Sequence, residues 1–276
     1  MAHTAPLTSE YKNQVGGRTT IVKIFGDHIL KPTTIYEVNS YLKMTASISA
    51  ISPDCCSIIS NGKFISLRHC HSCSDMCNLN TINALLNMST SGHYLIMRDA
   101  AYGMSRPRLL DLKLGTRTHS DFVSEEKKRS HIRKSMSTTS TPLGLRLCGA
   151  SFHEFESTEK TVISKMEGRS MTTSHFFNAM AVFFQIPERQ KNLVIQQLMK
   201  IKQALENCDS HRFFGSSLLI AIDDGYCNDF IEKSVKVKLI DFSSMARSEP
   251  GDVQYHGSDA GAILGVSTLI QLLEKS

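Results

Sequence analysis

Alternating apolar and polar residues mark the first part of the chain as rich in β-strands. Residues 18–31 alternate in this way around Gly26-Asp27-His28, which predicts a β-hairpin whose second strand ends at Lys31, where Pro32 would close it. Residues 1–17 are polar and are expected to form a flexible start. Shorter runs of the same kind predict strands near residues 57–59, 64–67, 93–97 and 108–114.

Helical spacing occurs once in this part and then becomes common. Ile35, Val38 and Leu42 recur at helical spacing behind Thr34, a suitable N-cap, so one helix is expected among the strands of the first 115 residues. Further along, helices are predicted over 124–134, 174–184, 187–207 and 259–275, strands over 143–148, 216–222 and 235–240, and the Ser-, Thr- and Lys-rich stretch 129–142 is the most loop-like.

The segment between Pro107 and Gly115 carries the pair of residues that bears most on function. Asp111 and Lys113 are two positions apart on a predicted strand, so their side chains point to the same face while the flanking leucines anchor the strand. A lysine there can neutralise a phosphate, and an aspartate can accept a hydroxyl proton or hold a metal ion. The alternative is a solvated ion pair on the surface of a strand.

Two further positions suit phosphoryl transfer. Lys31 precedes a helix that begins near Glu37, and a strand lysine facing a helix glutamate can hold nucleotide phosphates. Asp241 follows an apolar strand, where a carboxylate can present an oxygen ligand to Mg²⁺. Ser216 and Ser217 begin the preceding strand, and their hydroxyls could touch a phosphate or the metal. The simpler alternatives are that Lys31 is a surface lysine, that Asp241 caps a turn and that the two serines only start a strand.

Residues 127–134 form a strongly basic run, with five Lys or Arg residues and one His. A highly phosphorylated small molecule needs many compact cations at once, and lysine serves as a point charge for phosphate. A solvated helix face is the alternative. Nucleic-acid binding is not expected, because no aromatic residue lies between the charges and the net charge is only +5.

Composition narrows the class of protein. With 276 residues, 41% of them hydrophobic and 21% charged, the chain can form one large domain or two lobes that share a cleft. It has no apolar run long enough to cross a bilayer, and its start lacks the apolar core of a signal peptide. We therefore expect a soluble protein without membrane insertion, located in the cytoplasm, with the nucleus as a second location.

The cysteines allow a metal hypothesis. Cys70, Cys73 and Cys77 lie near two histidines, at a spacing that suits zinc, and Cys55 or Cys56 could complete the ligand set. The alternative is a loop of reduced thiols, which the absence of an export signal favours.

Taken together, these residues resemble the inositol polyphosphate kinase family. Pro107, Asp111, Lys113 and Gly115 match its signature, Pro-x-x-x-Asp-x-Lys-x-Gly. The resemblance implies an α+β, two-lobed, protein-kinase-like fold with a β-rich N-terminal lobe, residues 1–97, and a mixed C-terminal lobe, residues 98–276. It looks closest to the inositol hexakisphosphate kinases, through residues 14–17, 124–127, 144–149, 216–219 and 240–242.

The resemblance also implies a role for each site residue. ATP would contact Lys31, Met97, Arg98, Asp99, Asp111 and Asp241, with residues 97–99 as the hinge under the adenine and Asp99 available to the ribose. Asp241 and Ser217 would hold Mg²⁺, and Asp111 and Lys113 would be catalytic. The inositol phosphate would be held by Lys113, Lys127, Lys128, Arg133, Lys134 and Lys165. One departure concerns the hinge, where Arg98 replaces the acidic residue that is usual in the hexakisphosphate kinases. Another is His256-Gly257-Ser258-Asp259, a shortened form of the family motif.

The expected activity is ATP- and Mg²⁺-dependent phosphorylation of inositol polyphosphates by a monomer, chiefly of inositol hexakisphosphate to diphosphoinositol pentakisphosphate. The alternatives within the class are a hydroxyl kinase (multikinase) acting on inositol trisphosphate or tetrakisphosphate, and one protein with both activities. A non-catalytic inositol-phosphate-binding protein would need the basic run but not Lys31, Asp111 or Asp241. A protein kinase is excluded, because no His-Arg-Asp loop with a downstream Asn is present.

Overall fold

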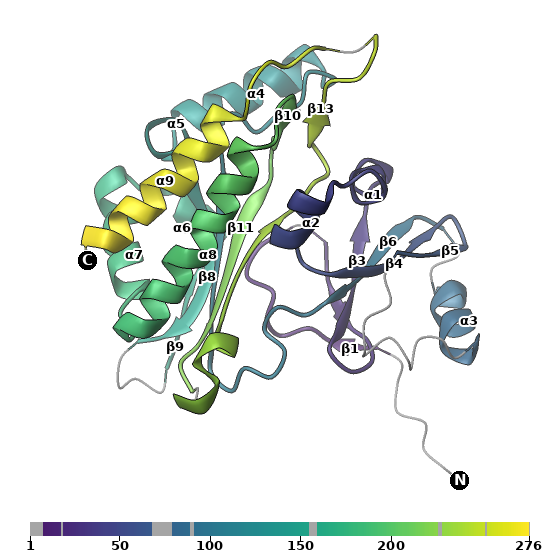
Figure 1. Ribbon diagram of the computed structural model, residues 1–276, viewed down its shortest axis with the longest axis horizontal. Helices are drawn as coiled ribbons and strands as arrows, with labels where there is room; N and C mark the ends of the chain where they lie inside the picture. The colour runs from purple at the N-terminus through teal and green to yellow at the C-terminus, as the bar shows by residue number, and fades with distance from the viewer. Residues whose placement is uncertain are drawn as a thin grey trace.

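Two antiparallel sheets, joined by one crossing of the chain, organise the computed structural model (Figure 1). The structure describes residues 8–17, 19–67, 79–88, 91–154, 159–225, 228–251 and 253–275. The first sheet has the order β1-β2-β3-β6-β4-β5. Its strands are β1 (Ser9–Glu10), β2 (Val22–Lys23), β3 (His28–Thr33), β4 (Cys55–Ser60), β5 (Lys63–Ser66) and β6 (His93–Arg98).

The second sheet has five strands in the order β12-β11-β7-β8-β9. The chain passes into it from the first sheet between Arg98 and Pro107. Its strands are β7 (Pro107–Leu114), β8 (Leu145–His153), β9 (Lys160–Ile163), β11 (Ser217–Asp223) and β12 (Val235–Ile240), and β10 (His211–Arg212) pairs separately with β13 (Ala246–Arg247).

The helices pack mainly on the second sheet, where α8 and α9 lie side by side across one face, while α2 of the first half lies against α8 (Figure 1). The helices are α1 (Ile35–Leu42), α2 (Ala46–Ile51), α3 (Leu79–Met88), α4 (Glu125–Met136), α5 (Ser140–Leu143), α6 (Lys165–Ser170), α7 (Thr173–Phe183), α8 (Glu188–Glu206), α9 (Ala260–Lys275) and the 3₁₀ helix η2 (Asn228–Lys233).

One apolar core runs through both halves of the molecule. Leu110, Leu112 and Leu114 of β7 are fully buried in it, which confirms that the leucines anchor this strand. Ile29 of β3 and Met97 of β6 belong to the same cluster. Each fully buried side chain of this size contributes about 1.5–3 kcal/mol relative to an exposed one. The shared core therefore holds the two sheets, and the cleft between them, in one arrangement.

The sequence patterns located most of the strands but missed the short strands β1, β9, β10 and β13 and some helices. β2, β3, β4, β5, β6, β7, β8, β11 and β12 lie where strands were predicted, and Thr34 caps α1 by accepting a hydrogen bond from the main-chain N–H of Glu37. The expectation of one helix in the first 115 residues is wrong, because α2 and α3 also form there. Both are short helices among strands, and α2 is held by contacts with α8 that local periodicity does not encode.

Two other expectations also need correction. The stretch 129–142 is not a loop, because α4 continues to Met136 and α5 follows. Pro32 does not end its strand, because β3 runs on to Thr33. Pro32 lies beyond the end of the neighbouring strand β2, so one edge of β3 is open there, and a sheet tolerates proline where no ladder bond is lost.

The cysteines of the zinc hypothesis, Cys70, Cys73 and Cys77, lie outside the described residues. Cys55 and Cys56 are buried on β4 and form no disulfide. In the described ranges, no group of three His, Cys, Asp or Glu side chains is arranged to hold a metal ion. Within the same ranges, none of the helices has the length and apolar character needed to cross a membrane.

Candidate active site

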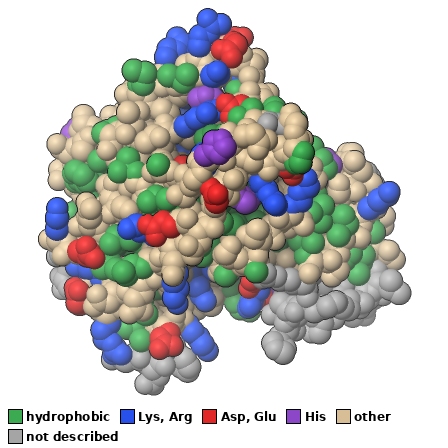
Figure 2. Space-filling view, turned by 45° about the horizontal axis from the view of Figure 1, so that its top comes forward, with side chains coloured by type: hydrophobic (Ala, Val, Ile, Leu, Met, Phe, Trp, Pro, Cys, Tyr) green, Lys and Arg blue, Asp and Glu red, His purple; other side chains and the backbone are tan. Residues whose placement is uncertain are grey.

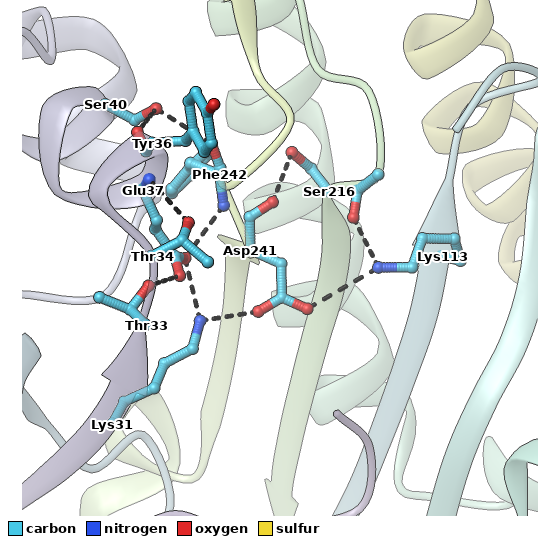
Figure 3. A network of polar contacts seen from close by, with 11 residues as sticks. Lys31, Thr33, Thr34, Tyr36, Glu37, Ser40, Lys113, Ser216, Asp241 and Phe242 are labelled. Atoms are coloured by element: carbon cyan, nitrogen blue, oxygen red, sulfur yellow. Dashed lines mark hydrogen bonds and ion pairs between the residues drawn. The ribbon is translucent and has the colours of Figure 1, made fainter. Parts of the chain in front are cut away.

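Lys31, Lys113 and Asp241 meet in the cleft between the two sheets. Figure 3 shows the two lysines, from β3 and β7, pointing toward Asp241 from opposite sides. Lys31 Nζ donates to Asp241 Oδ1 over 2.8 Å, and Lys113 Nζ lies 3.7 Å from Asp241 Oδ2. The site therefore consists of one carboxylate held between two ammonium groups that come from different halves of the molecule.

Helix α1 supports this cluster through Glu37. The Glu37 carboxylate is buried and accepts hydrogen bonds from Lys31 Nζ (2.9 Å), from the hydroxyl of Thr33 and from the main-chain N–H of Phe242 (3.1 Å). The Phe242 bond ties α1 to the residue that follows Asp241. The helix glutamate expected to face Lys31 is therefore present, and it also holds the loop that carries Asp241.

The loop after β12 adopts an unusual backbone at Asp241. Its φ is 66°, in the left-handed region that Asp and Asn tolerate better than most residues. Ser216 Oγ donates to the main-chain carbonyl of Asp241 over 3.1 Å, and Ser40 Oγ donates to that of Phe242 over 3.0 Å. These bonds fix the turn, so the Asp241 carboxylate is directed into the cleft between the lysines (Figure 3).

Opposing charges set the protonation of this cluster. Burial by itself would raise the pKa of Asp241, but the ammonium groups of Lys31 and Lys113 outweigh it and lower the pKa to about 2. Burial would lower the pKa of Lys31, whereas the carboxylates of Asp241 and Glu37 raise it above its ordinary value. Asp241 and Lys31 therefore stay charged across the physiological pH range.

Asp111 lies on the same face of β7 as Lys113, but it is covered. Its side chain is 4% exposed, and a Cβ atom placed on Gly16 would lie 2.0 Å from Asp111 Oδ2. Burial raises the pKa of Asp111, and the ammonium group of Lys113 opposes this increase. The surface ion pair is therefore wrong as an explanation of Asp111 and Lys113, because Lys113 is also only 17% exposed.

The N-terminal segment, residues 8–17, makes this cover. The expectation of a flexible start is wrong for these residues: Val15 packs against the buried cluster of Ala101, Leu109 and Ala221, and Gly149 leaves room for the main-chain carbonyl of Val15. Gln14 braces the following turn by donating to the carbonyls of Gly16 and Thr19. Gly16 and Gly17 were the sequence signal for this cover, because a segment can approach another part of the same chain closely where its residues lack a Cβ.

Ser217 and Lys165 complete the surroundings of Asp111. The hydroxyl of Ser217 lies beside Asp111 and tends to lower the pKa of its carboxyl, as does the more distant charge of Lys165. Within the described residues, neither Asp111 Oδ1 nor Ser217 Oγ makes a hydrogen bond of ordinary geometry. Lys165 begins α6 and lines a cavity of about 410 Å³ together with Cys148, Gly16 and other residues of the N-terminal segment.

The hinge follows β6 and is held from two sides. Met97 is buried in the core, and Arg98 turns back to form an ion pair with Asp27 (Nε to Oδ2, 2.8 Å). Asp99 Oδ1 accepts hydrogen bonds from the hydroxyl of Tyr11 (2.6 Å) and from the main-chain N–H of Ala101 (2.8 Å). Tyr11 was not foreseen from the sequence.

The basic residues of α4 do not share one face. At 100° per residue, Lys127 and Lys134 project in nearly the same direction, with His131 between them, whereas Lys128 and Arg133 project to other sides. Lys128 lines a separate cavity of about 330 Å³ and lies 3.4 Å from Glu125. In Figure 2, Lys and Arg side chains gather at the upper end of the molecule, above a group of His side chains.

A cleft lysine paired with a helix glutamate, opposite a charged aspartate from the other lobe, defines a two-lobed protein of the kinase-like α+β class. The chain belongs to the inositol polyphosphate kinase family, whose model matches residues 94–274.

Curated relatives and solved structures agree with this assignment. Human inositol hexakisphosphate kinase 2 is 29% identical over 215 residues, covering 65% of this chain and 50% of the relative. Mouse inositol hexakisphosphate kinase 3 is 30% identical over 197 residues, with coverage of 65% and 50%. The chain thus spans about half the length of these relatives. In fold it is similar to an inositol phosphate multikinase of S. cerevisiae, solved with ADP and Mn²⁺, at a TM-score of 0.68, 23% identity and coverage of 91% and 99%.

Proposed function

We propose that the chain transfers the γ-phosphoryl group of ATP to inositol polyphosphates, chiefly to inositol hexakisphosphate, giving diphosphoinositol pentakisphosphate. The observation that carries the proposal is the convergence of Lys31 and Lys113 on the charged carboxylate of Asp241, on which the charge of Lys165 also acts. Cations gathered around one carboxylate suit a reaction between two polyanions, because such a reaction needs charge neutralisation more than covalent chemistry.

The residues of the cleft fit a magnesium nucleotide. Asp241 offers a charged carboxylate, and the oxygens of Asp111 and Ser217 are hard ligands of the kind that Mg²⁺ accepts. Asp241 would hold the ion, with Ser217 as the additional oxygen proposed from the sequence. Magnesium, when bound, neutralises charge on the transferred phosphoryl group.

The two lysines of the cleft have different tasks. Lys31 is anchored by Glu37 and Asp241, so its ammonium group is held in place to bind the nucleotide phosphates. Lys113 donates to the main-chain carbonyl of Gly215 over 2.6 Å and reaches Asp241 at 3.7 Å. From its place on β7 in the second sheet, Lys113 reaches toward the loop that carries Asp241, where it stabilises the phosphoryl group during transfer. Met97, Arg98 and Asp99 would form the nucleotide hinge.

The inositol phosphate would bind to cations beyond the transferred phosphoryl group. Lys165 lines one cavity together with Gly16, which lies against Asp111, so we place Lys165 beside the reaction centre as a cation for the acceptor. On α4, Lys127 and Lys134 share one face and are exposed. We assign the acceptor to this face. Lys128 and Arg133 point elsewhere, so we expect them to contribute less to binding the inositol phosphate than the sequence suggested.

The cover over Asp111 favours a phosphate acceptor. A hydroxyl acceptor must lose its proton, which calls for a base within about 3 Å of the attacking oxygen. Asp111 is 4% exposed and lies under Gly16, so a ring hydroxyl cannot reach it while the N-terminal segment stays in place. A phosphate oxygen is already ionised and needs no base. Action on inositol trisphosphate or tetrakisphosphate is the second candidate, and it requires this segment to move.

The first test compares the turnover of three acceptors. The purified protein is incubated with ATP, Mg²⁺ and inositol hexakisphosphate, tetrakisphosphate or trisphosphate, and the products are separated by charge. We expect the fastest turnover with the hexakisphosphate. Faster turnover with trisphosphate would establish the hydroxyl-kinase candidate, and no turnover with any acceptor would overturn the proposal.

Matched double variants test the assignment of the helix face. Lys127→Gln with Lys134→Gln should raise the KM for inositol hexakisphosphate at least about tenfold, because each cation contributes a charge-assisted contact to phosphate. Lys128→Gln with Arg133→Gln removes the same charge from other faces of α4 and should raise this KM much less. Equal effects of the two pairs would show that only the total charge of the helix matters.

A further inference from the structure

The N-terminal segment, residues 8–17, joins two parts of the nucleotide cleft that are far apart in the sequence. Tyr11 reaches the hinge, 88 positions along the chain, at Asp99. Five residues later, Gly16 lies against Asp111. Tyr11, Gly16 and Lys165 also line the same cavity of about 410 Å³. The segment is therefore placed to act on the nucleotide end of the site as well as on the catalytic strand.

The contact between Tyr11 and Asp99 is short and directional. The Tyr11 hydroxyl donates to Asp99 Oδ1 over 2.6 Å, and the main-chain N–H of Ala101 donates to the same oxygen over 2.8 Å. Burial, followed by the charge of Asp99, raises the pKa of Tyr11 well above its ordinary value. The phenol therefore keeps its proton and remains a donor at any physiological pH.

Both of these hydrogen bonds end on Asp99 Oδ1, so Asp99 Oδ2 remains available as an acceptor. Among the described residues, Asp99 Oδ2 has no hydrogen-bond partner, and the residue is only half-buried. With Oδ1 fixed at two points, the plane of the carboxylate and the direction of Oδ2 are set. A carboxylate oxygen held in this way is a suitable acceptor for a sugar hydroxyl, because the bond is charge-assisted and costs little ordering.

The family resemblance implies that Asp99 meets the ribose of the nucleotide. We propose that Tyr11 is the positioning residue for this contact: it fixes Asp99 Oδ1 so that Asp99 Oδ2 is held ready to accept a hydrogen bond from a ribose hydroxyl. This inference rests on the proposed function, because it takes the cleft to be the nucleotide site. Tyr11 does not touch the transferred phosphoryl group, so it acts on nucleotide affinity and on the choice between ribose and deoxyribose.

Tyr11→Phe removes only the hydroxyl and keeps the ring. The parent protein should bind ADP about five- to tenfold more tightly than at least one of 2′-deoxy-ADP and 3′-deoxy-ADP, as expected for one charge-assisted hydrogen bond. In the variant we expect the affinity for ADP to fall to the affinity for that deoxy analogue. The affinity for the analogue itself should stay nearly constant. In turnover, the KM for ATP should rise by the same factor while kcat stays within about twofold.

Tyr102→Phe is the matched control. Tyr102 also follows the hinge, but its ring is 55% exposed, and its recorded contact is with the Lys23 ammonium over the ring face, 5.7 Å from the centroid, which phenylalanine preserves. This control should leave the ratio between ADP and the deoxy analogues unchanged. Urea unfolding of both variants shows whether either substitution disturbs the fold.

The outcomes separate this inference from the proposed function. Binding is measured by calorimetric titration of each Mg²⁺–nucleotide, so it does not depend on the acceptor. Equal weakening of ADP and of both deoxy analogues in Tyr11→Phe would mean that Tyr11 serves only in packing, and this result would overturn the inference. A parent protein that does not distinguish ADP from either analogue would overturn it as well. A parent that binds nucleotides with the expected discrimination, but phosphorylates no inositol phosphate, would refute the function and leave the role of Tyr11 intact.

Discussion

Replacing Asp241 with asparagine removes the negative charge that Lys31 and Lys113 share and preserves the shape of the side chain. Asparagine tolerates the left-handed backbone at this position, where φ is 66°, so the substitution tests charge and not backbone strain. It leaves two ammonium groups in the cleft with less compensation, and Glu37 becomes the main partner of Lys31.

The size of the effect follows from the pKa of Asp241. Burial would raise this pKa, but Lys31 and Lys113 lower it from 3.8 to about 2. The difference, 3.8 − 2, is about 1.8 pH units, and at about 1.4 kcal/mol per unit it corresponds to roughly 2 kcal/mol of folding free energy at neutral pH. The Asp241 side chain is 28% exposed, so solvent screening does not remove this contribution.

The sign of the pH dependence is fixed by the direction of the shift. Because the pKa is lower in the folded than in the unfolded protein, the stabilisation is complete above the unfolded value of 3.8 and is lost as the pH falls through about 2. The free energy of unfolding of Asp241→Asn should therefore be about 2 kcal/mol below that of the parent at pH 7, and about 1 kcal/mol below it at pH 3.

Urea unfolding, followed by circular dichroism at pH 7, 5 and 3, measures this difference without adding salt. Glu274→Gln is the control, because it removes an exposed carboxylate near the end of α9 and should change the free energy of unfolding by less than about 0.5 kcal/mol at each pH. A loss that is equal at pH 7 and pH 3, or a variant as stable as the parent at pH 7, would refute the reasoning.

Three further substitutions test other parts of the structure. Lys113→Met should lower kcat at least about a thousandfold while ATP affinity, measured by titration, changes less than about threefold; turnover like that of the parent would rule out its role in transfer. Gly16→Ala should destabilise the protein by about 1–3 kcal/mol in urea unfolding, because its Cβ would lie 2.0 Å from Asp111 Oδ2; full stability would show that the cover is loose. Arg108→Met should cost about 3–5 kcal/mol, because Arg108 is 3% exposed and pairs with Asp224 while donating to main-chain carbonyls at the end of α7, and adding Asp224→Asn should restore part of the loss.

The hinge illustrates how far sequence reasoning could go. The strand that ends at Arg98 and the position of Asp99 behind it were recognisable from local alternation and from the family resemblance. The ion pair of Arg98 with Asp27 and the bond from Tyr11 to Asp99 were not, because they join residues 71 and 88 positions apart. Contacts at such separations depend on how the sheet and the N-terminal segment pack, which no local pattern reports.

Helix α4 shows the same division on a smaller scale. Its start at Ser124, its acidic first turn and its basic end could be read from the sequence, because capping and the helix dipole are local effects. The sequence also marked the whole run as cationic. The separation of Lys127 and Lys134 from Lys128 and Arg133 also follows from the local helical period. Where these faces lie relative to the rest of the molecule depends on how the helix packs, which no local pattern reports.

By itself, the sequence determined where the main strands lie along the chain and which residue types make up the site. The spacing of Asp111 and Lys113, the apolar residues around them and the family signature at 107–115 are all local properties. Only the tertiary structure decided which of these groups meet. Lys31 and Asp241 are 210 positions apart and come together because α1 and a core shared by both sheets hold β3 opposite the end of β12. The same packing placed Gly16 over Asp111, so Lys113, at 17% exposed, is the more accessible of two residues that the sequence placed side by side on one face of a strand.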